Sequence, residues 1–422
     1  MPSCKDKNSP VPTPSITSLS PTSGIAGTTV VISGQNFSET ILRNIVMFNG
    51  KQTPVTAASF TQLTVSVPIA AGTGPVTIQV GDQTSNEVTF TYVISDVAGT
   101  LAGNNKAGYA DGTDTTARFK IPLGVAIDAA GNLYIADSGN QRIRKINPAG
   151  TVTTFAGSGK ASWKEGKATE AEFYNPSGVA VDASGNVYVA DYDNHRIRKI
   201  TPAGVVSTLA GGGNGASYMD GIGSEARFAF PTGVAVDKQG NVYVADRENQ
   251  VIRKITADGI VTTLAGKASN MGGYADGTGS EAQFNAPVGL AVDANNNVYV
   301  AEFGGHRIRK ITPTGVVSTI AGNGTPGFVQ GTGTVAQFNK PAGVAVDKDG
   351  TLLIADVGNN CIRKVSPTRE VTLFAGSGIA GTNAGPVATA EFNYPISLAI
   401  DANGLVYVAE ANNHRISKVE KK

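Results

Sequence analysis

The feature that most constrains this chain is a unit of 54 to 56 residues that recurs six times after residue 97. Each copy holds short alternating apolar segments separated by Gly, Pro, Asn and Asp. The copies can be aligned on one small residue each: Gly124, Gly178, Gly233, Gly289, Gly343 and Ser397. A repeat of this length with about four strand-sized segments is typical of propeller blades. We therefore expect an all-β fold, with a six-bladed β-propeller over residues 97–422.

Both faces of each repeat are apolar. In the first copy, Val125 and Ile127 would lie on one face of a strand, and Gly124 and Ala126 on the other. One face is bulky and the other is small, so neighbouring repeats can interlock. An isolated repeat, or an open row, would leave apolar faces in water, whereas a closed ring leaves none.

The two ends of the array complement each other. The sixth copy stops after its third strand, at residues 415–419, while residues 97–103 carry the fourth-strand pattern ahead of the first repeat. We expect residues 97–103 to complete the last blade. The N- and C-terminal strands of the array would then close the ring within one blade and leave no free sheet edge.

Residues 14–93 follow a different pattern. Short strand-like segments separated by turn residues cover 28–33, 45–48, 62–67, 76–80 and 88–93. Strands of this size and spacing predict a small β-sandwich. The motifs Ser20-Pro21-x-x-Gly24, Ile32-x-Gly34-x-x-Phe37 and Phe90-x-Tyr92 resemble an IPT/TIG domain of immunoglobulin-like fold. In extracellular bacterial proteins, the resemblance implies a spacer or a protein-contact module.

The long repeat resembles the NHL family. The clearest copy starts at Pro176-Ser-Gly178, continues through Asp191, and ends in Asn-His-Arg-Ile-Arg-Lys-Ile200. This resemblance covers about three quarters of the chain and implies a six-bladed NHL propeller.

The first 13 residues are polar and Pro-rich, which predicts a disordered tether. Cys4 followed by a short charged, Pro-rich spacer resembles the mature start of a bacterial lipoprotein. That resemblance implies a lipid on Cys4 and an extracytoplasmic place at the outer membrane or cell surface. The alternative is a free thiol in a floppy leader. No apolar run reaches the roughly 18 residues that span a bilayer, so any membrane attachment would be through this anchor.

The charge balance argues against nucleic acid as a partner. The chain has 34 basic and 33 acidic residues and a net charge of +1, so it creates no long-range field for a phosphate backbone. It also lacks an HExxH motif, a Gly-x-Ser-x-Gly elbow and a phosphate-binding Gly-rich loop. We expect a monomer without a cofactor.

Two sets of acids recur in every repeat. Because a functional site on a ring needs asymmetry, acids present in every blade are expected to serve the blade itself. The first set precedes a short turn and should accept backbone N–H groups: Asp128, Asp182, Asp237, Asp293, Asp347 and Asp401. The second set is expected to pair with Arg142, Arg196, Arg307 and Arg415 across the next turn: Asp137, Asp191, Asp246, Glu302, Asp356 and Glu410.

The long loops that join the blades are the candidate binding surface, on the top face of the propeller. Each contains a Phe that recurs in all six and is expected to pin the loop: Phe119, Phe173, Phe228, Phe284, Phe338 and Phe392. Other aromatics are distributed unevenly and could stack on sugars or peptide side chains: Trp163, Tyr109, Tyr218, Tyr274, Phe328, Tyr174 and Tyr394. The alternative is that these aromatics pack the loops. Trp163 is the first choice for a ligand contact.

Three histidines occupy one slot in alternate blades. A trigonal zinc site would use such three-fold symmetry, and His195, His306 and His414 are the candidates. An NHL-type lyase does use channel histidines, one of them in this slot. However, the slot follows the second strand, about 4.8 Å outside the strand that lines the channel. Zinc needs nitrogen ligands at about 2.1 Å, so we expect no metal at this position.

The function predicted from these observations is recognition or scaffolding outside the cytoplasm. The ligand would be a glycan or a protein bound on the loop-rich top face. One alternative is a propeller enzyme, a metal-dependent lyase or lactone hydrolase, that uses the central channel. The other is a structural spacer of the cell envelope.

Overall fold

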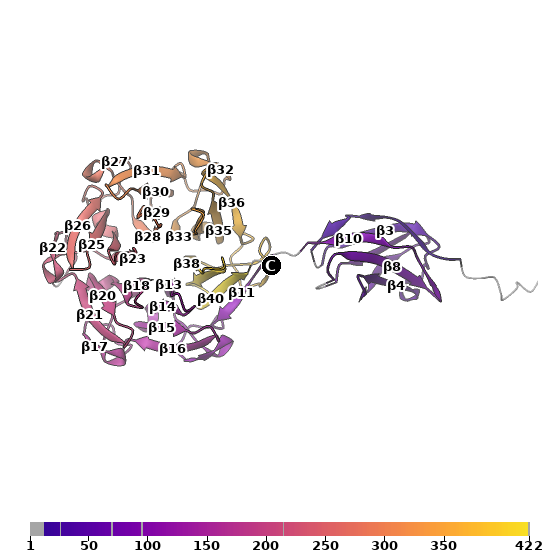
Figure 1. Cartoon of the computed structure of the whole chain (residues 1–422), viewed down its shortest axis with the longest axis horizontal. Coiled ribbons are helices and arrows are strands. Elements are labelled where there is room, and N and C mark those ends of the chain that lie inside the picture. Colours follow the sequence, from indigo (N-terminus) through magenta and orange to yellow (C-terminus); the bar gives the residue numbers. More distant parts are fainter. Residues whose placement is uncertain (1–11, 26, 69–70, 94–95, 214, 421–422) are drawn as a thin grey trace, which may run out of the picture. The chain divides into compact units, whose positions relative to one another are not determined.

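The computed structural model describes residues 12–25, 27–68, 71–93, 96–213 and 215–420. The chain divides into two compact units, one ending at residue 95 and the other beginning at residue 96 (Figure 1). Cys4 and most of the predicted tether lie outside the described residues. In the described part, no helix is both long enough and apolar enough to cross a bilayer.

The first unit is a sandwich of two β-sheets, as its sequence pattern predicts. One sheet has the order β1 (Ser15–Ser20), β3 (Thr29–Gln35), β7 (Gln62–Ser66) and β6 (Val55–Ala58). The other has the order β2 (Ser23–Gly24), β10 (Val88–Tyr92), β8 (Gly74–Val80), β4 (Asn44–Phe48) and β5 (Lys51–Thr53), with β9 (Gln83–Thr84) paired to β8. One 3₁₀ turn, η1 (Ile41–Arg43), precedes β4.

Alternate residues of these strands form the core of the sandwich. Val30 and Ile32 of β3 are fully buried, in one cluster with Phe48 of β4 and Phe90 of β10. The rings of Phe48 and Phe90 meet edge to face, with 5.2 Å between their centroids. The period of two in burial is what a strand with one face on the core requires.

The second unit is a ring of six sheets (Figure 1). From the axis outward, the first blade consists of β13 (Pro122–Ile127), β14 (Leu133–Asp137), β15 (Arg142–Ile146), β16 (Thr151–Ala156) and the short β12 (Gly112–Thr113). Four of these strands were expected from the repeat. The fifth, β12, comes from the loop that joins the blades, so that loop runs along the outer edge of the blade instead of only over its top.

The remaining blades repeat this order. Their strands, from the axis outward, are as follows. Blade two has β18 (Pro176–Val181), β19 (Val187–Asp191), β20 (Arg196–Ile200), β21 (Val205–Ala210) and β17 (Gly166–Lys167). Blade three has β23 (Pro231–Val236), β24 (Val242–Asp246), β25 (Val251–Ile255), β26 (Ile260–Ala265) and β22 (Gly221–Ile222). Blade four has β28 (Pro287–Val292), β29 (Val298–Glu302), β30 (Arg307–Ile311), β31 (Val316–Ala321) and β27 (Gly277–Thr278). Blade five has β33 (Pro341–Val346), β34 (Leu352–Asp356), β35 (Cys361–Val365), β36 (Glu370–Ala375) and β32 (Gly331–Thr332).

Short 3₁₀ turns occur at two places in the blades. After the second strand lie η3 (Ser138–Asn140), η5 (Tyr192–Asn194), η7 (Arg247–Asn249) and η10 (Val357–Asn359). In the joining loops lie η2 (Asp114–Thr116), η4 (Ala168–Glu170), η6 (Gly223–Glu225), η8 (Gly279–Glu281) and η9 (Gly333–Val335).

The sixth blade is built from both ends of the repeat array. Its order is β38 (Pro395–Ile400), β39 (Val406–Glu410), β40 (Arg415–Glu420), β11 (Val97–Ala102) and β37 (Gly385–Pro386). β11 pairs antiparallel with β40, from Val97 opposite Glu420 to Ala102 opposite Ile416, and the two lie side by side in Figure 1. The predicted closure of a six-bladed ring by residues 97–103 is confirmed.

Neighbouring blades interlock as their two-faced pattern predicts. The bulky face of the first blade, with Val125 and Ile135, packs on Ala399 and Ala409 of the sixth. The repeated glycine is required by the close approach of the inner strands. At Gly233, for example, an added Cβ would lie 2.2 Å from the carbonyl oxygen of Val288 in the next blade.

The two sets of repeated acids have the structural roles expected of them, but three of the four predicted arginine partners were wrong. In the first set, Asp128 accepts the backbone N–H groups of Ala130 and Asn132, at 3.0 and 2.8 Å. In the second, Asp191 pairs with Arg198 instead of Arg196, at 2.8 Å, and both side chains are fully buried. Arg196 lies at the strand end and donates to the carbonyl of Asn194.

The same correction holds in most blades. The observed pairs are Arg144–Asp137, Arg198–Asp191, Arg253–Asp246, Arg309–Glu302 and Arg363–Asp356. The predicted partners Arg142, Arg196 and Arg307 therefore do not pair with these acids. In each of these blades, the arginine two residues further along the strand is fully buried and occupies the position beside the carboxylate. In the sixth blade Ser417 occupies that deeper position, and Arg415 pairs with Glu410 at 2.7 Å, as predicted.

Candidate functional site

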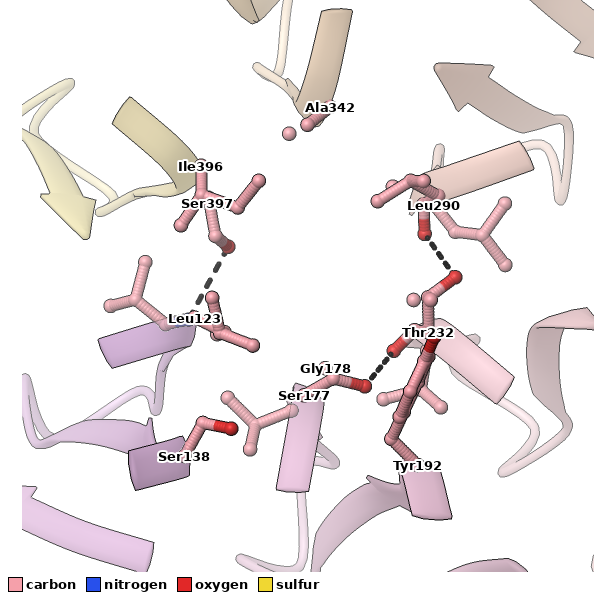
Figure 2. Close-up of a pocket in the computed structure, with 18 of the residues that line it drawn as sticks. Leu123, Ser138, Ser177, Gly178, Tyr192, Thr232, Leu290, Ala342, Ile396 and Ser397 are labelled. Carbon is pink, nitrogen blue, oxygen red and sulfur yellow. Dashed lines mark hydrogen bonds between the residues drawn. The ribbon is translucent and has the colours of Figure 1, made fainter. Parts of the chain in front are cut away.

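A cavity of about 560 Å³ lies on the axis of the propeller, among the inner strands of all six blades. Each inner strand begins with a Pro, and the residue that follows this Pro lines the cavity in all six blades. These six residues are Leu123, Ser177, Thr232, Val288, Ala342 and Ile396. Figure 2 labels Leu123, Ser177, Thr232, Ala342 and Ile396 around the cavity. The volume falls within the range of roughly 300–1,000 Å³ that is usual for small-molecule sites.

Most of this wall is apolar toward the cavity. Leu123, Val288, Ala342 and Ile396 are hydrocarbon side chains. The two hydroxyls are already engaged with the neighbouring blade. Ser177 donates to the carbonyl of Thr232 at 3.0 Å, and Thr232 donates to the carbonyl of Val288 at 3.2 Å (Figure 2). The wall of the channel therefore offers a ligand mainly van der Waals contact.

The mouth of the cavity is different in each blade. Ser138, Tyr192, Arg247 and Phe303 line it, each placed directly after the second strand of its blade. The equivalent residues of blades five and six, Val357 and Ala411, are buried, with exposed fractions of 1% and 2%. At this position, polar and aromatic side chains therefore line the mouth in blades one to four and not in blades five and six.

The residues before the inner strands complete the mouth. Ile121, Asn175 and Tyr394 precede the first Pro of their blades and line the cavity. They adopt left-handed φ angles of 51°, 49° and 56°, which turn the chain sharply from the joining loop into the inner strand. The turn after the second strand lies against this corner, since the N–H of Asp193 donates to the carbonyl of Tyr174 at 3.1 Å. Both loops therefore form one face, as expected.

Neighbouring blades contact one another at the mouth through side chains. Arg247 donates through Nη1 to the hydroxyl of Tyr192, at 3.2 Å. The Tyr192 ring lies 5.0 Å from the ring of Phe230. Lys340 places its Nζ 5.8 Å from the centroid of Phe303. These contacts place two cations and three aromatic rings along one arc of the rim.

Five of the aromatics singled out from the sequence lie away from the cavity. Each stacks on an arginine of the third strand of its blade: Tyr109 on Arg142, Trp163 on Arg196, Tyr218 on Arg253, Tyr274 on Arg307 and Phe328 on Arg363. Their guanidinium carbon-to-centroid distances range from 3.7 to 5.0 Å. All five keep between 42% and 49% exposure, so they pack the loops and still present a surface.

Hydrogen bonds to the fourth strand place these aromatics on the outer part of the blades. Trp163 donates through Nε1 to Thr208 of β21 at 3.3 Å, and the Tyr109 hydroxyl bonds Thr154 of β16 at 2.8 Å. Of the two remaining candidate aromatics, Tyr394 lines the cavity, whereas Tyr174 is 41% exposed and does not line it.

Tyr192, Arg247 and Phe303 were not singled out from the sequence. A signal for them exists: they immediately follow the acid that recurs in every blade, and their slot holds six different residues in the six blades. A position that varies completely beside one that hardly varies is where a symmetric ring acquires an asymmetric site.

The three histidines connect neighbouring blades instead of converging on the axis. Each accepts, through Nδ1, the backbone N–H of the residue before the Pro of the next blade. The bonds are His195 to Phe230 at 3.1 Å, His306 to Lys340 at 3.0 Å and His414 to Ile121 at 3.2 Å. The part of the chain that the structure describes contains no cluster of three His, Cys, Asp or Glu residues suited to a metal ion.

Amide side chains make the same bond in the other blades. Gln141 accepts from Asn175 at 2.6 Å, Gln250 from Ala286 at 2.7 Å and Asn360 from Tyr394 at 3.2 Å. At this position, His, Gln and Asn each place a hydrogen-bond acceptor at a similar distance from their backbone. We call these six hydrogen bonds between neighbouring blades the clamp.

The clamp predicts a pH dependence of stability. Burial lowers the pKa of His195, His306 and His414, and each Nδ1 must be unprotonated to accept its hydrogen bond. As the pH falls through about 6.5, the unfolded chain takes up protons before the folded chain does, so stability is full above that pH and decreases below it. We expect a loss of about 1.5–3 kcal/mol between about pH 7.5 and pH 5, from three bonds of about 0.5–1 kcal/mol each.

The matched control is the triple variant H195Q/H306Q/H414Q, which copies the glutamines of blades one and three. It should keep the clamp and lose this share of the pH dependence when thermal unfolding is followed by circular dichroism at each pH. The same slope in both proteins would show that the histidines do not control it.

Comparison with known proteins matches both units. A model of the IPT/TIG domain matches residues 14–92. A model of the NHL repeat matches residues 119–146, 173–200, 228–255, 284–311, 338–365 and 392–419. Each NHL match begins at the recurring Phe of the joining loop and ends with the third strand of the blade.

Similar proteins occur in plants, animals and bacteria. The protein SUPPRESSOR OF QUENCHING 1, chloroplastic, of Arabidopsis thaliana is 31% identical over 326 residues, which cover 72% of this chain and 31% of that protein. The chain spans less than half the length of the first curated relatives that it matches.

Two solved structures resemble the chain over almost its whole length. One is described as an auxiliary nutrient binding protein from Bacteroides thetaiotaomicron, with a TM-score of 0.74, 19% identity and coverage of 98% of both chains. The other has the same description and comes from Bacteroides ovatus, with a TM-score of 0.62, 20% identity and coverage of 98% of this chain and 99% of that one. At this identity the likeness establishes a shared fold.

Proposed function

The chain combines an IPT/TIG domain with a propeller of six NHL repeats, and from this premise we propose that it is a non-enzymatic recognition protein. Its ligand, a glycan or a segment of a protein partner, enters the axial cavity from the loop-rich top face. The proposal includes an extracytoplasmic location with a lipid on Cys4, supported by the lipoprotein-like sequence that follows this residue.

The observation that carries the proposal is the asymmetric mouth of the cavity. Five-stranded blades with a common frame place Ser138, Tyr192, Arg247 and Phe303 at equivalent positions around a mostly apolar channel. Uneven polar and aromatic groups over an apolar cavity are the usual composition of a small-ligand site. Two solved structures of this fold are described as auxiliary nutrient binding proteins, so a nutrient glycan is the ligand to test first.

The test compares two aromatic surfaces of the same propeller. The full chain is screened on a glycan array, and affinities for the best ligand are measured by calorimetry. We expect Phe303→Ala at the mouth to weaken binding by about two- to tenfold, because stacking contributes roughly 0.5–1.5 kcal/mol beyond the buried area. Trp163→Ala also removes a partly exposed aromatic ring but lies outside the cavity, and it should bind normally.

The opposite pattern would move the binding surface to the joining loops. In that case Trp163→Ala loses affinity and Phe303→Ala keeps it. Failure of the full chain to retain any glycan on the array, and any protein in a pull-down, would leave the spacer role instead.

A further inference from the structure

Arg247 is the one charged side chain among the described residues that line the cavity, and no acidic side chain joins it there. It is the first residue of η7, directly after the buried strand β24, so the backbone holds it at the rim. Its side chain is 31% exposed. The electrostatic character of the cavity is therefore set by one partly accessible cation.

The guanidinium group of Arg247 is only partly used by the protein. Nη1 donates to the Tyr192 hydroxyl at 3.2 Å, which orients the group. Nε is buried and has no hydrogen-bond partner. The nearest acid, Glu248, lies 3.7 Å from Nε and is 46% exposed, so this ion pair contributes little. By contrast, Arg253 on the neighbouring strand β25 is fully buried and bound to Asp246 at 2.8 Å.

The surroundings of Arg247 suit a ring-shaped ligand with one anionic group. Tyr192, Phe303 and Tyr394 supply aromatic faces at the mouth. Lys340, with its Nζ 5.8 Å from the Phe303 ring, adds a second cation beside the rim. Below them the wall is mostly hydrocarbon, which accepts the apolar face of a sugar ring but no charge.

We propose that the ligand of this cavity carries a carboxylate bound by Arg247, and that the ligand class is acidic saccharides ending in a uronate. The inference rests on the proposed function and names its ligand. Arginine presents donors in a planar fork that matches a carboxylate, a fit that lysine does not reproduce. The sugar ring stacks on the aromatic rim while its carboxylate binds the solvent-accessible part of the Arg247 guanidinium group.

The experiment uses two pairs of probes that differ only in the carboxylate. Digalacturonate is compared with the neutral galactose disaccharide, and a glucuronate-ended disaccharide with its glucose counterpart, by calorimetry on the full chain. We expect each acid to bind at least tenfold tighter than its neutral partner. The preference should weaken as salt is added, because the pair is only partly buried.

Variants assign the preference to Arg247. Arg247→Met should remove the preference for the acid, and Arg247→Lys should retain only part of it. Arg43→Met changes the net charge equally but lies on the exposed turn η1 of the sandwich, so it should bind like the unmodified chain. Thermal unfolding of each variant checks that the propeller is intact. If Arg247→Met does not fold, the loss of preference for the acidic saccharide is measured on Arg247→Lys.

The outcomes separate this inference from the proposed function. Equal affinity for acidic and neutral saccharides, unchanged by Arg247→Met, overturns the carboxylate inference and leaves a glycan-binding cavity. No binding of either kind, together with an empty glycan array and an empty pull-down, overturns both.

Discussion

Replacing Ala102 with Asp is expected to destabilise the propeller by several kcal/mol. Ala102 ends β11, is fully buried, and packs with Phe119 and Ile135 of the first blade and Ile416 of the sixth. A carboxylate placed there has no partner, and the desolvation of an unpaired charge costs several kcal/mol. Because the contact between β11 and the first blade closes the ring, unfolding should begin there. Thermal unfolding followed by circular dichroism measures the loss of stability.

Gly99→Ser in the same strand is the matched control. An added Cβ at Gly99 would have only the Cβ of Ala384 within 4 Å, at 3.8 Å, so the change should be tolerated. Deletion of residues 97–103 should be as damaging as deletion of residues 412–422, because each removes a strand from the same sheet. An Ala102→Asp protein that melts like Gly99→Ser would contradict closure through β11.

The second large effect is expected from Arg198→Met. Arg198 is fully buried, pairs with Asp191 at 2.8 Å, and donates to the carbonyls of Glu172 and Lys164 at 3.0 and 2.9 Å. It therefore holds the joining loop against the third strand. Removing one partner of a buried pair costs about 3–5 kcal/mol, since the other charge remains without compensation. Urea unfolding of the full chain measures the loss.

The variant should also have its own pH dependence. Burial raises the pKa of Asp191, and the Arg198 guanidinium opposes that rise. Without Arg198, the folded state holds a proton on Asp191 that the unfolded state releases, so stability should decrease as the pH rises through the raised pKa. The double variant Asp191→Asn/Arg198→Met removes the charge as well and should recover part of the stability and lose this slope. A single variant as stable as the unmodified chain would show that the pair does not hold the loop.

The buried pairs hold the backbone beneath the mouth of the cavity in place. Each pair ties the second strand, the third strand and the joining loop together in its blade, and the clamps of His, Gln and Asn tie that corner to the next blade. Residues at the rim, such as Arg247 and Phe303, follow directly from this frame. They can differ from blade to blade without cost to the ring, because the frame does not depend on them.

Much of the fold could be predicted from the repeat. The strands, the alternation of bulky and small faces, and the completion of blade six by residues 97–103 follow from a pattern repeated six times. The fifth short strand of each blade did not, because a two-residue segment such as β12 carries no periodicity. The choice between Arg196 and Arg198 could not be predicted either, since both lie on the same face of β20 and differ only in their position along the strand.

The site was predicted only in part. The sequence pointed to the top face, and Tyr394 lines the cavity there, but Trp163 and the four related aromatics stack on arginines at the outer part of the blades. A joining loop of about 20 residues can cross the top face or run down the outer edge of the blade, and its amino-acid composition does not indicate which path it takes. Tyr192, Arg247 and Phe303 come from blades about 55 residues apart in the chain, so no local pattern shows that they meet.

The sequence by itself determined the number of blades, the pairing of the two ends and the positions that repeat. These follow from the periodic pattern of apolar residues, which can be read directly from the chain. The tertiary structure alone decided which variable residues surround the axis and which atoms remain free to bind. That choice depends on how six sheets curve around one centre and how deeply each side chain sits, and both are properties of the closed ring instead of any one repeat.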